Sequence, residues 1–224
     1  MAQPPNIVIL VAKADPGTKS KGVSLLIVET GDLPGYSVGR RLKKIGMKRN
    51  DTAELAFADM RLAQTALLGM DEGQGFYQLM KQLPWERLIL GYIALGASQC
   101  ALRVTLEYVR ERRAFGRRVM DFQNTRFKLA EAATRIELLG AFLDRCLADL
   151  EAGRLTPEGA AMAKWWGSQT QCDIADECLQ LHGGYGHMSE YLISELYTDA
   201  RVQKIYGGTN EIMKDVIARS LDID

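Results

Sequence analysis

The spacing of apolar residues changes once along the chain, near Gly73, and this change limits the possible folds more than any other feature. Before it, β-branched and apolar residues alternate in short runs. After it, apolar residues recur every three or four positions over long stretches, as on one face of a helix. The pattern predicts an α+β chain, mainly α. We expect a partial antiparallel middle β-domain over residues 1–70 and a C-terminal antiparallel four-helix bundle over residues 71–224.

The first seventy residues contain the runs that we expect to be strands. They cover residues 6–13, 22–29, 36–42 and 52–60, and a strong turn signal at residues 15–21 separates the first two. We expect one antiparallel sheet fragment of about four strands, with an open edge that needs a partner.

The later part of the chain predicts a series of helices. Two long apolar stripes run through residues 88–109 and 129–150, and Gly153 is a suitable C-terminal cap for the second. A third helix opens at Thr156-Pro157-Glu158, where a capping hydroxyl precedes proline and an acid, and continues to Leu181. Shorter helices are expected over residues 193–200 and 211–221.

Composition excludes some classes of protein. The net charge is zero, which gives no general attraction to nucleic acid or to an anionic membrane. No window approaches the ~20 apolar residues of a membrane span, and no signal peptide precedes the first strand. The four cysteines show no disulfide framework, so we expect free thiols and a cytoplasmic location.

A dense basic run over residues 110–118 has three interpretations. Nucleic-acid binding would need more basic residues and aromatic stacking partners on one face. A phosphate site is possible because guanidinium groups bind phosphate in a bidentate manner. Composition alone favours a third interpretation, a solvated helix end with cations near its C-terminal dipole.

His182 and His187 lie five residues apart beside glycines. No third ligand with suitable spacing accompanies them, so we expect a polar turn and no metal site.

Two glycine pairs near the end of the chain stand beside polar residues that can cap helices. Residues 180–186 read Gln-Leu-His-Gly-Gly-Tyr-Gly, and residues 205–213 read Ile-Tyr-Gly-Gly-Thr-Asn-Glu-Ile-Met. Glycine lets backbone approach a ligand closely, and amides at a helix start can hold phosphate oxygens. Either pair alone is more often a helix stop or a tight turn. Together they favour a binding site.

Three segments in this order resemble the C-terminal half of the acyl-CoA dehydrogenase family. They are residues 112–117 followed by Gln123, which match an RxxFG…Q pattern, residues 180–184, and residues 209–211. The resemblance implies contacts to FAD, partly to a flavin that a neighbouring subunit holds. The implied FAD-contacting residues are Arg112, Phe115, Gln123, Gln180, Leu181, His182, Gly183, Gly184, Thr209, Asn210 and Glu211.

The resemblance also bears on the catalytic base. Many family members carry it directly after the tyrosine of the last motif, where this chain has Gly207. Glu211 is a poor substitute, because an acid in a first helical turn commonly serves the helix dipole. The long-chain and isovaleryl-CoA branches place the base on the first long helix, and residues 83–88, Leu-Pro-Trp-Glu-Arg-Leu, resemble their segment. Glu86 is therefore the expected base. The plainer interpretation, a first-turn acid after Pro84 or an arginine partner, is less favoured because of Gly207.

The chemistry that the resemblance implies is FAD-dependent α,β-dehydrogenation of an acyl-CoA thioester to the trans-2-enoyl-CoA. Glu86 would remove the α-proton while the β-hydride passes to flavin N5, and apolar surroundings would make its carboxylate a stronger base. The residues expected along the acyl-CoA path are Tyr77, Pro84, Arg87, Gly207 and Gly208.

The resemblance covers essentially the whole chain but only the later part of the family pattern. We expect that the N-terminal helical domain and the first part of the β-domain are lacking, and that Met1 falls near the start of a strand. Expected partners are acyl-CoA, electron-transfer flavoprotein as acceptor, and further copies of the chain in a homotetramer built as a dimer of dimers. Alternatives are a catalytically silent, truncated oligomerising module of the same family and, far behind, a nucleic-acid-binding module.

Overall fold

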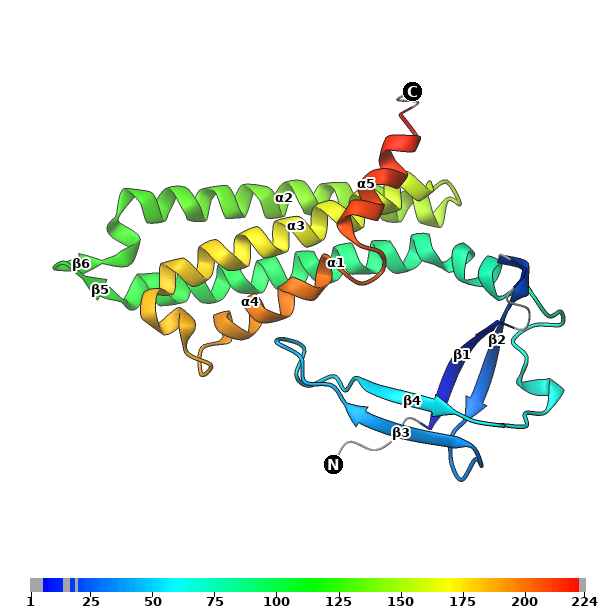
Figure 1. Ribbon diagram of the computed structural model, residues 1–224. Coiled ribbons are helices and arrows are strands. Elements are labelled where there is room, and N and C mark those ends of the chain that lie inside the picture. The colour runs from blue at the N-terminus through cyan, green and yellow to red at the C-terminus, as the bar shows by residue number, and fades with distance from the viewer. Residues whose placement is uncertain (1–5, 14–16, 19, 222–224) are drawn as a thin grey trace. The chain divides into compact units, whose positions relative to one another are not determined.

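The computed structural model describes residues 6–13, 17–18 and 20–221, and it divides into two compact units. Unit 1 is Met1–Gln82 and carries two β-hairpins, and unit 2 is Leu83–Asp224 and is almost entirely helical (Figure 1). The boundary between the units falls inside the long helix α1 (Gly75–Glu111). The first turns of α1 pack within unit 1, where Gln78 Nε2 donates to Leu68 O at 2.7 Å. The functional division at residues 70/71 stays a prediction.

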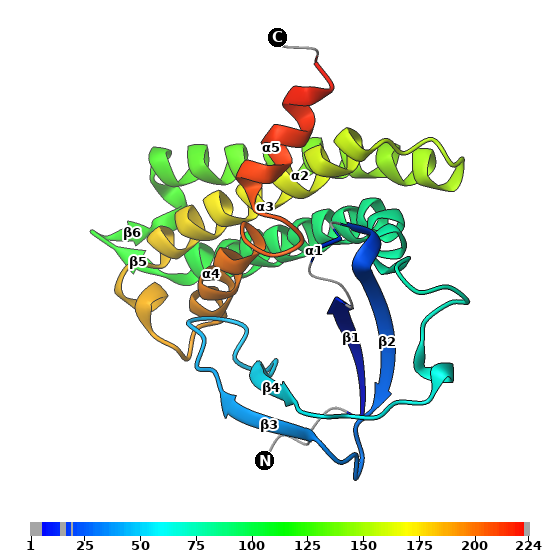
Figure 2. The same cartoon turned by 45° about the vertical axis from the view of Figure 1, so that its right-hand side comes forward.

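Unit 1 contains antiparallel pairs, as expected, but not one sheet of four strands. β1 (Ile7–Lys13) pairs with β2 (Val23–Glu29), and β3 (Tyr36–Arg41) pairs with β4 (Ala53–Phe57) in a separate hairpin (Figure 2). The expected single sheet is wrong for the described residues, because the second edge of β2 is occupied by another segment. Leu26 forms a bridge with Leu67, and Leu68 N donates to Leu25 O at 2.8 Å.

The strand expected over residues 52–60 is shorter than the apolar alternation suggested. β4 ends at Phe57, and Asp59 adopts a φ of 49°, which ends an extended strand. The expected turn at residues 15–21 lies partly outside the described residues, as does Met1; residues 20–22 form a short 3-10 helix.

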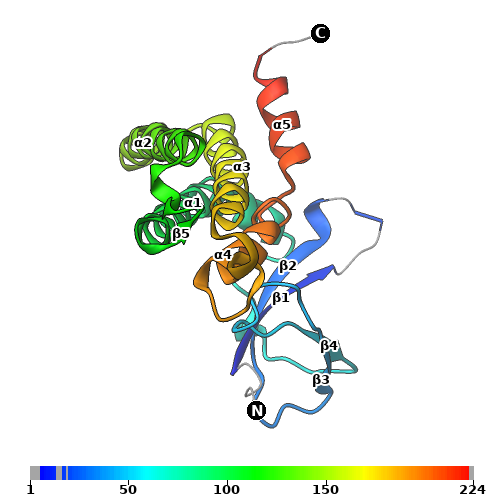
Figure 3. The same ribbon diagram turned by 90° about the vertical axis from the view of Figure 1, so that its left-hand side faces the viewer.

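Unit 2 confirms the expected helices. They are α1, α2 (Gln123–Glu151), α3 (Pro157–His182), α4 (Leu192–Gln203) and α5 (Asn210–Arg219). Successive long helices run antiparallel and pack side by side, as the view along their axes shows (Figure 3). Thr156 Oγ1 accepts from Gly159 N at 3.2 Å with Pro157 at the first position, so the predicted N-terminal cap of α3 is confirmed. Gly153, with a φ of 68°, lies where α2 ends.

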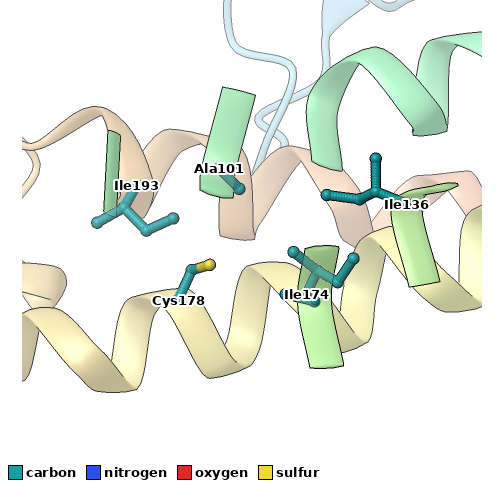
Figure 4. Packing of buried hydrophobic residues seen from close by; sticks show 6 residues of the cluster. Ala101, Ile136, Ile174, Cys178 and Ile193 are labelled. Atoms are coloured by element: carbon teal, nitrogen blue, oxygen red, sulfur yellow. The ribbon is translucent and has the colours of Figure 1, made fainter. Parts of the chain in front are cut away.

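The bundle core consists of two apolar clusters. One contains Ala101, Ala132, Ile136, Ile174, Cys178 and Ile193, from α1, α2, α3 and α4 (Figure 4). The other lies around Leu88, Leu139 and Leu143. Helices α1 and α3 approach closely at Gly91 and Gly167, because a Cβ on Gly167 would lie 3.1 Å from the Gly91 Cα. This contact sets the distance between the axes of α1 and α3 near Gly91 and Gly167.

Helix α1 is long and apolar enough, by length and composition, to cross a membrane, contrary to the sequence expectation. Its 18-residue window has a mean hydropathy of 1.4. Leu88, Ala94, Ala101 and Val109 of this helix are buried in the bundle, and its polar Ser98 and Thr105 are buried as well. We therefore interpret α1 as the core helix of the bundle.

Candidate active site

Glu86 lies in the interior of α1. The helix begins at Gly75 and contains Pro84, so Glu86 is not a first-turn acid. The other plain interpretation, a partner for a nearby arginine, stays open, because Glu86 raises the pKa of the adjacent Arg87. Pro84 removes one backbone donor from the helix, which loosens the turn just before Glu86. The Glu86 carboxylate is exposed in the chain, and Trp85 beside it is 48% exposed. The expected base therefore projects from a helix whose next turn, at Leu88 and Leu90, is buried.

Gly207 faces Glu86 from the turn before α5. A Cβ built on Gly207 would lie 3.7 Å from Glu86 Oε1 and would overlap Leu90 Cδ1. The φ of Gly207 is 63°, which side chains rarely adopt. The two positions that the resemblance offers for a base, 86 and 207, therefore converge on one place. The carboxylate comes from position 86, while position 207 has no side chain and Leu90 occupies the space where its Cβ would lie.

Arg87 and Gly208 lie beside this pair. Arg87 is buried, its Nε has no hydrogen-bond partner, and its Nη2 lies 4.0 Å from a Cβ built on Gly208. Burial lowers the pKa of Arg87, while the neighbouring Glu86 raises it. An unpaired buried guanidinium nitrogen costs folding energy unless something pairs with it. Its place suits an acceptor oxygen on a ligand.

The turn is attached to α3 by a buried polar network. Lys164 Nζ donates to Gly208 O at 2.7 Å and to Asn210 Oδ1 at 2.9 Å, and Ser168 Oγ donates to the same Asn210 oxygen at 3.0 Å. The Lys164 side chain is completely buried. Burial lowers the pKa of Lys164 to about 8, while Glu211 raises it and Arg87 lowers it further.

Glu211 is an exposed residue in the first turn of α5. Hydrogen bonds from its own backbone N–H and from the Thr209 hydroxyl lower its pKa. Thr209 Oγ1 in turn accepts from Ile212 N at 3.4 Å, which caps the helix. A carboxylate held in this way is a weaker base, which agrees with the sequence interpretation of Glu211 as a capping residue.

The other glycine pair lines an open cavity of about 460 Å³ at the end of α3. A Cβ on Gly183 or Gly184 would meet nothing within 4 Å, so this backbone faces open space. Arg112 also lines the cavity, and its guanidinium lies 5.3 Å from the centre of the Tyr185 ring. The remaining lining residues are Tyr108, Ala114, Val119, Gln180, Leu181, His182 and Met188.

His182 is a core residue of this region. Its Nδ1 lies 2.8 Å from Cys178 O, so Nδ1 carries the proton that it donates to this carbonyl. Its ring stacks on Tyr108 at 4.3 Å, and the Tyr108 hydroxyl donates to His182 O at 3.1 Å. Burial lowers the pKa of His182, and the bond to Cys178 raises it. The described residues contain no cluster of metal-ligating side chains, and His182 contributes a buried ring at the helix end.

The basic run forms a small hairpin between α1 and α2. Its strands are β5 (Arg113–Ala114) and β6 (Arg117–Arg118), and Phe115 at the tip is 95% exposed with a φ of 53°. Arg118 pairs with Asp121, and the Arg117 guanidinium lies 4.0 Å from the centre of the Phe122 ring. These contacts position part of the run locally and leave Phe115 projecting.

The structure therefore brings the sequence-predicted residues into groups. Glu86, Arg87, Gly207 and Gly208 form one, with Pro84 in the turn of α1 just before Glu86. Arg112 and the segment 180–184 form another, with Phe115 at the nearby hairpin tip and Gln123 at the start of α2. Tyr77 lies in unit 1, where its ring packs edge-on against Phe76.

Comparison with known proteins decides the family. The sequence model of the family "Acyl-CoA dehydrogenase, C-terminal domain" matches residues 73–221. The chain belongs to the acyl-CoA dehydrogenase family. It is 49% identical over 215 residues to the pig mitochondrial long-chain specific acyl-CoA dehydrogenase, covering 96% of this chain and 50% of the relative.

Solved structures of acyl-CoA dehydrogenase relatives agree in fold. The acyl-CoA dehydrogenase of Geobacillus kaustophilus superposes with a TM-score of 0.93 at 45% identity, covering 97% of this chain and 57% of that one. A chain from the structure of the electron transferring flavoprotein of Acidaminococcus fermentans superposes with a TM-score of 0.91 at 32% identity, covering 98% and 57%. The chain spans about half the length of the curated relatives it matches.

The residues present fit the acyl-CoA dehydrogenase cofactor that the resemblance implies. The open backbone at Gly183 and Gly184 and the Arg112 cation suit a large ligand with both a charged phosphate part and flat aromatic parts.

Sequence reasoning missed three residues of this candidate site: Leu90, Lys164 and Ser168. Leu90 lies one helical turn after Glu86, and helical spacing could have found it. Lys164 and Ser168 are buried on a face of α3 that also buries the small residues Ala160, Ala163 and Gly167 and the polar Gln171. A charged residue on such a face indicates a buried partner.

Proposed function

We propose that the full-length protein is an FAD-dependent acyl-CoA dehydrogenase in which Glu86 removes the α-proton of the acyl-CoA thioester. One observation carries the assignment of the base. Position 207, where the resemblance places the base of other family members, is a glycine here. A Cβ built on it would lie 3.7 Å from Glu86 Oε1, and Leu90 occupies that space. Glu86 is the carboxylate at this place, whereas Glu211 accepts hydrogen bonds from its own backbone N–H and from the Thr209 hydroxyl.

The neighbouring residues support binding of the thioester. Gly207 and Gly208 carry no side chains of their own, and the resemblance implies that they line the acyl-CoA path together with Pro84 and Tyr77. Arg87 presents a buried Nε that lacks a partner, and an oxygen of acyl-CoA would satisfy it. Once the acyl chain covers Glu86, water is excluded and the carboxylate becomes a stronger base.

FAD, when bound, supplies a hydride acceptor at its N5 atom. The residues that would hold it are Arg112, through its charge, and the backbone at residues 180–184, through its open surface. Thr209, Asn210 and Glu211 would offer the N-terminus of α5 to its phosphate part, with Phe115 and Gln123 as further contacts.

We further propose that other protein chains complete the system. The exposed Phe115 and the open Gly183–Gly184 backbone support a cofactor site shared between copies in a homotetramer built as a dimer of dimers. The likeness to a chain in an electron transferring flavoprotein structure supports such a flavoprotein as electron acceptor. The cytoplasmic location stays a prediction.

The test replaces Glu86 by glutamine in the full-length protein, which keeps the size of the side chain and removes its basicity. We expect kcat for acyl-CoA oxidation to fall by roughly 10²–10⁴-fold, the usual contribution of a general base. The second measurement is exchange of the α-proton of acyl-CoA into deuterated water, which reports proton removal at carbon and should fall in parallel.

Glu107→Gln is the control, because Glu107 is an exposed acid farther along the same helix that pairs with Arg103. It should change kcat by less than about threefold, in line with the loss of a surface ion pair. A Glu86→Gln enzyme that keeps both rates near those of wild type would refute the assignment. A flavin-free, inactive wild-type oligomer would favour the catalytically silent module instead.

A further inference from the structure

Lys164 is a charged side chain in a place where a protein seldom keeps one. It is completely buried on the inner face of α3, next to Ala163 and one turn from Ser168. Burying an ammonium group without partners is strongly unfavourable, so its partners indicate what the lysine does. Both of them, Gly208 O at 2.7 Å and Asn210 Oδ1 at 2.9 Å, belong to the turn that precedes α5.

This turn contains two consecutive glycines, Gly207 and Gly208. They have φ values of 63° and 93°, and glycine loses more conformational freedom on ordering than any other residue. A pair of glycines therefore needs an external constraint to hold one conformation. Lys164 supplies it by binding the carbonyl of Gly208 and the side chain of Asn210, the first residue of α5.

The other groups around Lys164 bear on the same turn. Arg87 comes from α1 and reaches toward Gly208, and the Glu211 carboxylate comes from α5. Ser168 Oγ shares the Asn210 oxygen at 3.0 Å. Polar groups from three helices thus meet at the turn, and Lys164 donates to two of its residues, Gly208 and Asn210.

We propose that Lys164 is a positioning residue, which fixes the Gly207–Asn210 turn opposite Glu86 so that acyl-CoA meets a preformed backbone. This inference rests on the proposed function, because it takes acyl-CoA as the ligand. A preformed site avoids the entropic cost of ordering the glycine pair when the ligand binds. The same turn fixes the distance between the ligand and the Glu86 carboxylate, so both binding and turnover depend on it.

The test compares Lys164→Met with Lys128→Met in the full-length protein. Methionine keeps much of the length of the lysine but cannot donate. Lys128 is the matched control because it also joins two bundle helices, α2 and α3, through its ion pair with Glu177. If Lys164 only supported the bundle, Lys164→Met and Lys128→Met would have the same effect on ligand binding and on the turn.

Two measurements report the turn. The first is the Kd of a 3-thia-acyl-CoA of the chain length that the wild type oxidises fastest, which binds without being oxidised. The second is amide hydrogen exchange of peptides that cover residues 205–210. For Lys164→Met we expect Kd to rise roughly tenfold, kcat to fall as well, and exchange in the turn to accelerate. For Lys128→Met we expect Kd, kcat and exchange in the turn to stay at wild-type values.

The outcomes separate the two proposals. If wild type binds the thia-acyl-CoA and Lys164→Met binds it equally well with unchanged exchange in the turn, the positioning role is wrong and the proposed function stands. If wild type binds no acyl-CoA, the proposed function is wrong and so is the role of Lys164 toward that ligand. If Lys164→Met does not fold, Lys164→Gln replaces it. Its donor is one bond shorter, so it should loosen the turn and raise Kd in the same direction, and unchanged values would again overturn the positioning role.

Discussion

The two glycine pairs of the helical unit have similar sequences but opposite surroundings. At Gly207 and Gly208, an added Cβ would overlap Leu90 and would lie 2.7 Å from Met213 Cε. At Gly183 and Gly184, it would meet nothing within 4 Å. The first pair is glycine because other residues occupy the space, and the second leaves its backbone open on the wall of a cavity. A repeated Gly-Gly signature can therefore mark both a turn packed against side chains and a backbone that faces open space.

The largest expected difference between the pairs concerns folding stability. Gly207→Ala adds a methyl group that overlaps Leu90 at a positive φ, so we expect a loss of about 2–5 kcal/mol, the sum of overpacking and left-handed strain. Gly184→Ala should change stability by less than about 0.5 kcal/mol. Urea unfolding of both variants measures this. In a Leu90→Ala background, Gly207→Ala should cost less stability than in wild type, because the overlap with Leu90 is gone. Equal stability losses for Gly184→Ala and Gly207→Ala would contradict the comparison.

Folding stability should depend on pH through Lys164, which binds the turn at Gly207 and Gly208. Burial lowers the pKa of Lys164 to about 8 from 10.5, so between these values the unfolded chain binds more protons than the folded one. Stability should therefore rise with pH across this window, by on the order of 3 kcal/mol from Lys164. The difference in unfolding free energy between wild type and Lys164→Met, measured at pH 7 and pH 10, isolates this contribution. A difference that does not change with pH would contradict it.

The open pair should show its effect in cofactor binding. Arg112→Ala removes a cation from the cavity wall beside Gly183 and Gly184, so we expect FAD to bind roughly 10–100-fold more weakly, the value of a charged hydrogen bond. Arg103→Ala is the control, since Arg103 is exposed and pairs with Glu107 elsewhere on α1. Flavin absorbance after dialysis of the full-length protein measures retention. Equal flavin loss in both variants would show that Arg112 does not contribute to FAD binding.

The sequence predicted much of the helical unit and less of the β unit, for physical reasons. The helices carry their own signals, such as the Thr156 cap and the apolar stripes, because each buries one face along its whole length. Strand pairing has no such local signal: β2 pairs with β1 on one edge and meets Leu67 on the other, a distant contact that alternation does not encode. Similarly, the resemblance pointed to Glu86 and Gly207, whereas Leu90 and Lys164 are placed at the site only by the packing of α1 and α3.

The smallest expected effect compares two helix caps of the same kind. Thr156 Oγ1 accepts from Gly159 N at the start of α3, and Thr209 Oγ1 accepts from Ile212 N at the start of α5. Replacing either by alanine should cost about 1 kcal/mol of stability, because each removes one cap. Only Thr209 adjoins the enclosed glycine pair, so Thr209→Ala alone should also weaken 3-thia-acyl-CoA binding, by roughly threefold, in a titration that measures Kd. Equal Kd values for the two variants would mean that the turn is held without the cap, by Lys164 and Ser168 through Asn210.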